Sequence, residues 1–168
     1  MRTQRRGTFE LSTTAWLPQP VDVVFGFFGD AANLDVLTPP WLGFEIVTAG
    51  PIVMQVGTLI DYRITLRMLP IRWRTRIAAW EPNHRFVDEQ LRGPYREWVH
   101  THEFAAVDGG TLMTDTVRYR VPGGALVNRL LVEPDVTRIF RYRLDALRRH
   151  FHSDASHRDV DVTVRRLH

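Results

Sequence analysis

Residues Tyr95–Val121 read YREWVHTHEFAAVDGGTLMTDTVRYRV, and this stretch predicts two long strands joined by a tight turn. On both sides of Asp108-Gly109-Gly110, side chains of one face alternate with those of the other, as they do in strands of a sheet. Asp-Gly and Gly-Gly are typical of two-residue turns between antiparallel strands. The stretch therefore predicts a β-hairpin.

The turn also fixes which residues of the hairpin face one another. With Asp108-Gly109 in the turn, the opposed pairs are Phe104 with Met113, His102 with Asp115, His100 with Val117, and Trp98 with Tyr119. A Gly109-Gly110 turn shifts this register by two residues. The shared face is aromatic and apolar but carries a few polar groups, as the wall of a small-molecule pocket does.

The length and composition predict one globular domain. The chain has 168 residues, and 44% of them are hydrophobic, which is enough for a sizeable core. No apolar run has the length of a membrane span, and no hydrophobic segment follows the charges of the N-terminal Met1–Gly7. We therefore expect a cytoplasmic protein that does not insert into membranes.

The residue types that the chain lacks exclude several kinds of catalytic and binding chemistry. The chain has no cysteine and no lysine, which excludes disulfides, thiolate chemistry and Schiff bases. Its serines, at 12, 153 and 156, lie in no nucleophile motif. The net charge of +3 comes from arginines mixed with carboxylates, which indicates a solvated surface rather than a nucleic-acid site.

The order of predicted elements is a strand, two short helices, six strands and a long helix. Thr8–Leu17 alternates as a strand, and helical spacing then places Val21, Val24, Phe25 and Phe28 on one face. A second short helix begins after Asp30. Glu133–Phe151 predicts the long helix, with Pro134 in its first turn. The remaining strands are expected at 44–48, 58–68, 71–79 after a turn near Leu69-Pro70, 85–91, and in the hairpin.

This order predicts an α+β domain over residues 8–151. A curved antiparallel sheet of about seven strands wraps around the long helix. Residues 1–7 and 152–168 are expected to be disordered, because they have few bulky apolar side chains. The alternation of Val160, Val162 and Val164 leaves an additional edge strand open.

Three segments carry a resemblance to a known superfamily. They are Leu37–Phe44 (LTPPWLGF), Gly93–Phe104 (GPYREWVHTHEF), and Gly110–Tyr119 (GTLMTDTVRY) followed by Pro122. With the element order, they resemble the START and birch-pollen-allergen-like superfamily, also called SRPBCC, in its bacterial cyclase/dehydrase-like branch. The resemblance implies a helix-grip fold around a hydrophobic cavity that takes a lipid-like or polyketide-like ligand. It implies no catalytic residue, because only some members are enzymes.

Strand alternation then predicts which side chains line this cavity. We expect a volume of several hundred Å³, typical of ligand sites, between the sheet and the helix from Val136 to Phe151. The predicted ligand-binding residues are Tyr62, Ile64, Trp73, Thr75, Trp98, His100, His102, Asp115, Tyr119 and Phe140. The predicted cavity mouth consists of Trp41, Leu42 and Phe44.

The pair His102 and Asp115 has two interpretations. It is either a general base oriented by a carboxylate or a buried polar pair that satisfies its own hydrogen bonds. His100 and His102 also have a spacing that suits zinc, with Asp115 as third ligand. The sequence assigns no catalytic residue, and we expect neither a cofactor nor a metal.

Three functions follow from these patterns. The first is binding of an apolar or aromatic small molecule. The second is a cofactor-independent acid/base enzyme, such as a polyketide aromatase/cyclase or a dehydratase. The third is a basic interaction domain that uses the outer arginines at 63, 67, 72, 74 and 76. The sequence favours the first, expects no nucleic-acid partner, and leaves a homodimer open.

Overall fold

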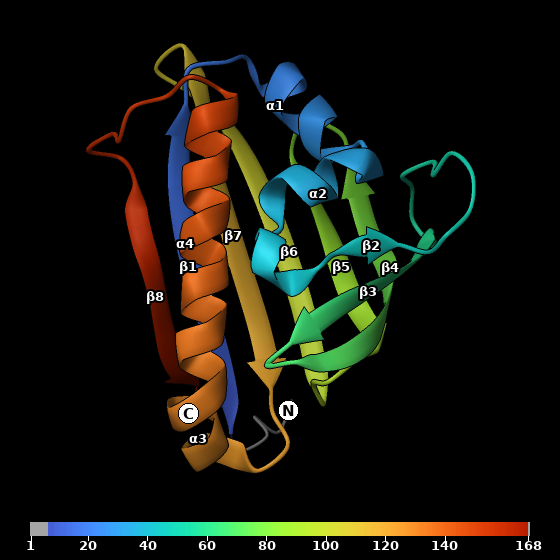
Figure 1. Ribbon diagram of the computed structural model, residues 1–168. Helices are drawn as coiled ribbons and strands as arrows, with labels where there is room; N and C mark the ends of the chain where they lie inside the picture. The colour runs from blue at the N-terminus through green and yellow to red at the C-terminus, as the bar shows by residue number, and fades with distance from the viewer. Residues whose placement is uncertain (1–6, 168) are drawn as a thin grey trace, which may run out of the picture.

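The computed structural model describes residues 7–167, and Figure 1 shows a strongly curved sheet with its helices on the concave side. Residues 1–6, most of the N-terminal tail for which we expected disorder, lie outside the described part. The helical elements are α1 (Val21–Phe28), η1 (Ala31–Asn33), α2 (Leu34–Leu37), η2 (Pro40–Leu42), α3 (Gly124–Val127), η3 (Asn128–Val132) and α4 (Glu133–His150). The strands are β1 (Thr8–Leu17), β2 (Glu45–Ile46), β3 (Leu59–Leu66), β4 (Leu69–Glu81), β5 (Arg85–Arg92), β6 (Glu97–Val107), β7 (Gly110–Arg120) and β8 (Val160–Leu167).

All neighbouring strands of the sheet are antiparallel, in the order β2-β3-β4-β5-β6-β7-β1-β8. In Figure 1, α4 lies along the concave side over β1 and β7, and α1 and α2 cover the same side toward β5 and β6. Pro134 lies in the first turn of α4, as expected. The predicted helix-grip fold is confirmed, with eight strands rather than about seven.

The hairpin of β6 and β7 has the predicted register. Asp108 and Gly109 have φ angles of 49° and 76°, so both central turn residues are left-handed, as a type I′ turn requires. His102 pairs with Asp115, and Trp98 pairs with Tyr119. The Asp-Gly register is therefore confirmed.

The turn between β3 and β4 lies earlier than the predicted Leu69-Pro70. Arg67 and Met68 form it, with φ angles of 49° and 66°. Arg67 holds it against the helical region, because its guanidinium donates hydrogen bonds to the Asp135 carboxylate at 2.7 Å and to the Leu131 carbonyl at 3.2 Å. The turn is therefore held by a long-range contact of Arg67, and the expected Leu69-Pro70 lies at the start of β4.

The core consists of two clusters, one at each half of helix α4. One joins α1 to the C-terminal half of α4 and includes Phe25, Phe28, Leu144 and Phe151. The other joins the N-terminal half of α4 to β1, β7 and β8. Within residues 7–167, no helix is long and apolar enough to span a membrane.

The expectation that 152–168 is disordered is wrong for residues 160–167. These residues form β8, which pairs with β1 from Thr8 to Thr14. Val162 is buried, and ion pairs add further contacts, among them Arg141 with Asp161 and Arg165 with Glu10. The edge strand that the alternation of Val160, Val162 and Val164 left open is therefore present, although the segment has few bulky apolar residues.

Asp159 is the main anchor of the segment before β8. Its carboxylate accepts hydrogen bonds from the Trp16 backbone N–H at 2.8 Å, from Arg148 at 2.8 Å and from the Ser156 backbone N–H at 3.1 Å. Burial alone would raise the pKa of Asp159, but these donors outweigh it and hold the pKa below the usual 3.8. The carboxylate thus stabilises the fold above that pH.

We expect Asp159→Asn to reduce the acid sensitivity of the fold. Because the pKa is lowered on folding, the contribution of Asp159 is present above pH 3.8 and is lost as the pH falls through the folded-state pKa. In urea titrations, the variant should be less stable by about 1–3 kcal/mol at neutral pH, and this gap should close in acid. Asp161→Asn, at an exposed ion pair, is the control and should have a smaller effect. An unchanged gap in acid would contradict the assignment.

Candidate functional site

A cavity of about 180 Å³ lies between the concave face of the sheet and the helices. The residues that α4 contributes to its wall are Val136, Ile139, Phe140 and Arg143. The cavity is smaller than the several hundred Å³ expected, and it does not extend to Phe151. The reason is that Leu144, Leu147 and Phe151 pack against α1 and fill the space at that end.

Most of the predicted site residues line this cavity. They are Tyr62, Ile64, Trp73, Thr75, Trp98, His100, His102 and Phe140, together with Leu42 and Phe44 from the predicted mouth. Three predicted residues do not line it. Asp115 lies behind the histidines, Tyr119 is fully buried beside Phe9, and Trp41 packs on Tyr142 at the surface.

One end of the cavity is aromatic. Tyr62 stacks on Trp73 with ring centroids 5.8 Å apart, and Trp73 meets Trp98 edge to face at 5.5 Å. Tyr95, which the sequence analysis did not assign to the site, packs on Trp98 at 4.6 Å. The Trp73 indole donates a hydrogen bond to the Thr75 hydroxyl at 3.1 Å. This end therefore offers flat apolar surfaces with few free polar atoms.

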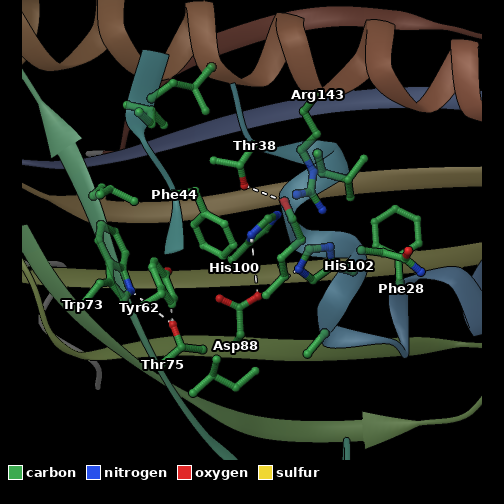
Figure 2. Close-up of a pocket in the computed structure, with 18 of the residues that line it drawn as sticks. Phe28, Thr38, Phe44, Tyr62, Trp73, Thr75, Asp88, His100, His102 and Arg143 are labelled. Atoms are coloured by element: carbon green, nitrogen blue, oxygen red, sulfur yellow. Dashed lines mark hydrogen bonds and ion pairs between the residues drawn. The ribbon is translucent and has the colours of Figure 1, made fainter. Parts of the chain in front are cut away.

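The polar wall of the cavity comes from β5 and β6, and β7 supports it from behind. His100 and His102 project from the central strand β6, between Asp88 on β5 and Asp115 on β7. His100 Nε2 donates to Asp115 at 2.9 Å, and His102 Nε2 donates to Asp88 at 2.9 Å. Figure 2 shows Asp88, His100, His102 and Arg143 gathered at this wall.

Each histidine also approaches the other carboxylate. His102 Nδ1 lies 2.7 Å from Asp115 Oδ1, and His100 Nδ1 lies 3.6 Å from Asp88 Oδ2. His102 Nδ1 nevertheless makes no hydrogen bond within the described residues, so this short approach lacks hydrogen-bond geometry. The predicted pairing of His102 with Asp115 thus holds in register, whereas the hydrogen bond to Asp115 comes from His100.

Arg143 completes the cluster, although the sequence did not predict a role for it. Its Nε donates to Asp115 Oδ2 at 2.9 Å, and its side chain is only 11% exposed. The signal was present, because Arg143 follows Phe140 by one turn and precedes Leu147 by another on the buried face of α4. A charged residue within an apolar helix stripe needs a buried partner.

Asp88 belongs to the site although the sequence assigned it no role. The structure places it on the cavity wall with a side chain that is 18% exposed. The pairing of β4 with β5 contains two register shifts, between Arg74 and Thr75 and between Ile77 and Ala79. Such irregularities change strand parity, so simple alternation could not be carried across to β5.

The pKa values follow from burial and from these contacts. Burial would raise the pKa of Asp115, but Arg143 and the histidines hold it well below 3.8. Burial would raise the pKa of Asp88 as well, but the charges of the histidines outweigh burial and hold this pKa below its usual value. Burial and the neighbouring imidazole lower the pKa of His100, whereas the two carboxylates raise that of His102 against its burial. When His102 is protonated, its charge and that of Arg143 balance the charges of the two carboxylates.

Three of these side chains could also hold a metal ion. Asp88, His100 and His102 each place one ligand atom within 4.8 Å of the others. The sequence suggested Asp115 as the third ligand. In the structure, Asp115 instead contacts the backs of both imidazoles and Arg143.

Comparison with known proteins places this chain in a family. The model of the family described as polyketide cyclase/dehydrase and lipid transport matches residues 8–152. The chain belongs to this family, which lies in the SRPBCC superfamily, so the resemblance seen in the sequence is confirmed. A search of curated proteins found no similar sequence.

Solved structures show the same fold at low sequence identity. The Zhui aromatase/cyclase from Streptomyces sp. R1128 has a TM-score of 0.69 and 16% identity, over 86% of this chain and 94% of that one. The ginseng major latex-like protein 151 from Panax ginseng has a TM-score of 0.63 and 14% identity, over 86% and 98%. Protein Ms6760 from Mycobacterium smegmatis has a TM-score of 0.63 and 18% identity, over 85% and 90%. At such identities, the comparison supports the fold alone.

Proposed function

We propose that this protein binds a small, mainly apolar molecule that carries an aromatic ring and one polar group. The observation that carries the proposal is the Asp88 carboxylate, which is partly exposed on the wall of an otherwise apolar cavity. Ligand sites typically combine such walls with a few convergent polar groups that orient the ligand.

The cavity volume supports a ligand of limited size. At about 180 Å³, the cavity is somewhat larger than an engineered cavity of about 150 Å³ that accepts benzene. One ring with a short substituent fits this space, whereas a multi-ring polyketide requires the aromatic end to open. Tyr62, Trp73 and Trp98 offer the faces and edges on which a ring packs.

The polar end supports recognition of a hydroxyl or a carbonyl group. Asp88 with a lowered pKa is an acceptor, and Arg143, which lines the same wall, has further N–H donors besides the Nε–H that it gives to Asp115. A ligand hydroxyl could therefore both donate and accept at this wall. Specificity would then depend on leaving neither group unpaired.

A second candidate function is acid/base catalysis without a cofactor, as in a cyclase or dehydratase. The contacts of His102 with Asp88 and Asp115 favour it, because they fix the orientation of an imidazole beside the cavity. Of the two candidates that the sequence offered, only His102 reaches the cavity. Asp115 is 1% exposed and would act as a positioning residue.

We expect Ile64→Trp to weaken ligand binding without unfolding the protein. The new indole would occupy the cavity that Ile64 lines. A suitable probe is 4-fluorophenol, one ring with one polar group, followed by fluorine NMR. Its affinity should fall by about tenfold or more, as the loss of a filled apolar pocket does.

Thr65→Trp is the matched control, because Thr65 is the next residue of β3 and is exposed. It should bind the probe as the wild type does. Equal binding by all three proteins, or no binding by the wild type, would refute the proposed site. Native mass spectrometry of the purified protein separates the two functions. A co-purified ligand of unchanged mass after incubation supports binding, and conversion that is lost in His102→Gln supports catalysis.

A further inference from the structure

We propose that Asp88, His100 and His102 form a binding site for a divalent transition-metal ion, best suited to zinc, with its open coordination position facing the cavity. Two imidazoles and one carboxylate form a common donor set of zinc sites that keep a position for water or substrate. The same set with open positions also serves ferrous iron. The site uses the Asp88 carboxylate that the proposed function assigns to ligand recognition, but its test needs the metal alone and no organic ligand.

The spacing of the three donors fits a single ion. Bonds of about 2.0–2.1 Å in a tetrahedral site separate the ligand atoms by about 3.3 Å. His102 Nε2 lies 2.9 Å from Asp88 Oδ2, and His100 Nδ1 lies 3.6 Å from the same oxygen. These two distances lie on either side of the required one, and the three ligand atoms all lie within 4.8 Å of one another, so small side-chain shifts admit the ion.

The surroundings of the histidines are those of metal ligands. A metal-bound histidine usually donates its second ring N–H to a carboxylate, which fixes its orientation. Asp115 Oδ1 lies 2.9 Å from His100 Nε2 and 2.7 Å from His102 Nδ1, the two nitrogens that would face away from the ion. Arg143 holds the other oxygen of Asp115. One carboxylate thus orients both imidazoles.

A second observation points to the same site. The buried His102 Nδ1 has no hydrogen bond within residues 7–167, although it lies beside the Asp115 carboxylate. As long as His102 Nε2 donates a hydrogen bond to Asp88, that bond sets the orientation of the imidazole ring. An ion in place of this proton would release the ring to turn Nδ1–H toward Asp115.

The charges of the cluster also permit an ion. Asp88, Asp115 and Arg143 sum to one negative charge when the histidines are neutral. A divalent ion would reverse this to one positive charge, which an anionic fourth ligand would cancel. Because Asp88, His100 and His102 line the cavity and Asp115 does not, that ligand must come from the cavity side. The expected fourth ligand is hydroxide or the deprotonated oxygen of an organic molecule.

The test is a titration of the chelator-treated full chain with Zn²⁺, and with Co²⁺ for its visible absorption. We expect one ion per chain and a spectrum of nitrogen and oxygen coordination. Asp88→Asn keeps the shape but removes the ligand charge, and it should weaken binding by about 100-fold or more. Asp115→Asn should weaken binding by about 10–100-fold. Circular dichroism checks the fold of each variant.

The control is a variant in which the exposed His84, His150, His152 and His157 are replaced by glutamine. It should bind one ion as the wild type does. The proposal is overturned if the wild type binds no ion, if folded Asp88→Asn binds within about threefold of it, or if binding disappears in the control. None of these outcomes depends on whether 4-fluorophenol binds.

Discussion

Arg143→Met should lower the free energy of unfolding by about 3–5 kcal/mol. The substitution keeps most of the apolar stem but leaves the Asp115 carboxylate, which is 1% exposed, without its cationic partner. Breaking a buried ion pair from one side has this cost because the remaining charge stays desolvated. Urea unfolding at neutral pH measures the difference, and 4-fluorophenol binding reports on the cavity wall in the variant that still folds.

Arg141→Met is the matched control for this substitution. Arg141 lies on the same helix and pairs with Asp161 through Nε and Nη2, but its side chain is 56% exposed. Exposed pairs contribute about 0–1 kcal/mol, so this variant should remain close to the wild type. Similar losses in both variants would show that burial of Asp115 does not set the cost.

Deletion of residues 153–168 should lower the melting temperature by roughly 6–12 °C. The deletion removes β8, the burial of Val162 and the hydrogen bond from the Trp16 backbone N–H to Asp159. Together these losses amount to about 3 kcal/mol, and about 1 kcal/mol corresponds to 2–4 °C in a domain of this size.

Addition of a synthetic 153–168 peptide provides the control for the deletion. Because β8 is held by pairing with β1 and by ion pairs, the separate peptide should bind and restore part of the lost stability. A scrambled peptide should not. An unchanged melting temperature after the deletion would mean that β8 contributes little to the fold, as the sequence composition suggested.

The hairpin shows why much of the fold was predictable. Asp108-Gly109 is a local signal that determines a turn type, and the turn type sets the register for both strands. From this one dipeptide, the positions of His100, His102 and Asp115 followed. The inward face of β3 and β4 was equally accessible, because Tyr62, Ile64 and Trp73 alternate with charged residues.

The rest of the site depends on contacts between distant segments. Asp88 lies on β5, whose pairing with β4 contains two irregularities. Arg143 pairs with Asp115 on β7, and the helix sequence alone does not identify this partner. The cavity volume was overestimated because parity shows which side chains point inward, but not how closely they pack. Strand β8 was left open as an alternative to disorder, because the alternation of Val160, Val162 and Val164 stands in a segment with few bulky apolar residues.

The place of β1 between β7 and β8 has a consequence for how the chain acquires its structure. Thr14 contacts Thr114 across 100 residues of sequence, and Thr163 contacts Ser12 across 151. During synthesis, β1 therefore stays without either neighbour until most of the chain has emerged, whereas β6 and β7 pair with each other as soon as both exist. Over that interval, β1 exposes unpaired backbone and the apolar face of Phe9 and Leu11, which makes it the segment most in need of protection by a chaperone.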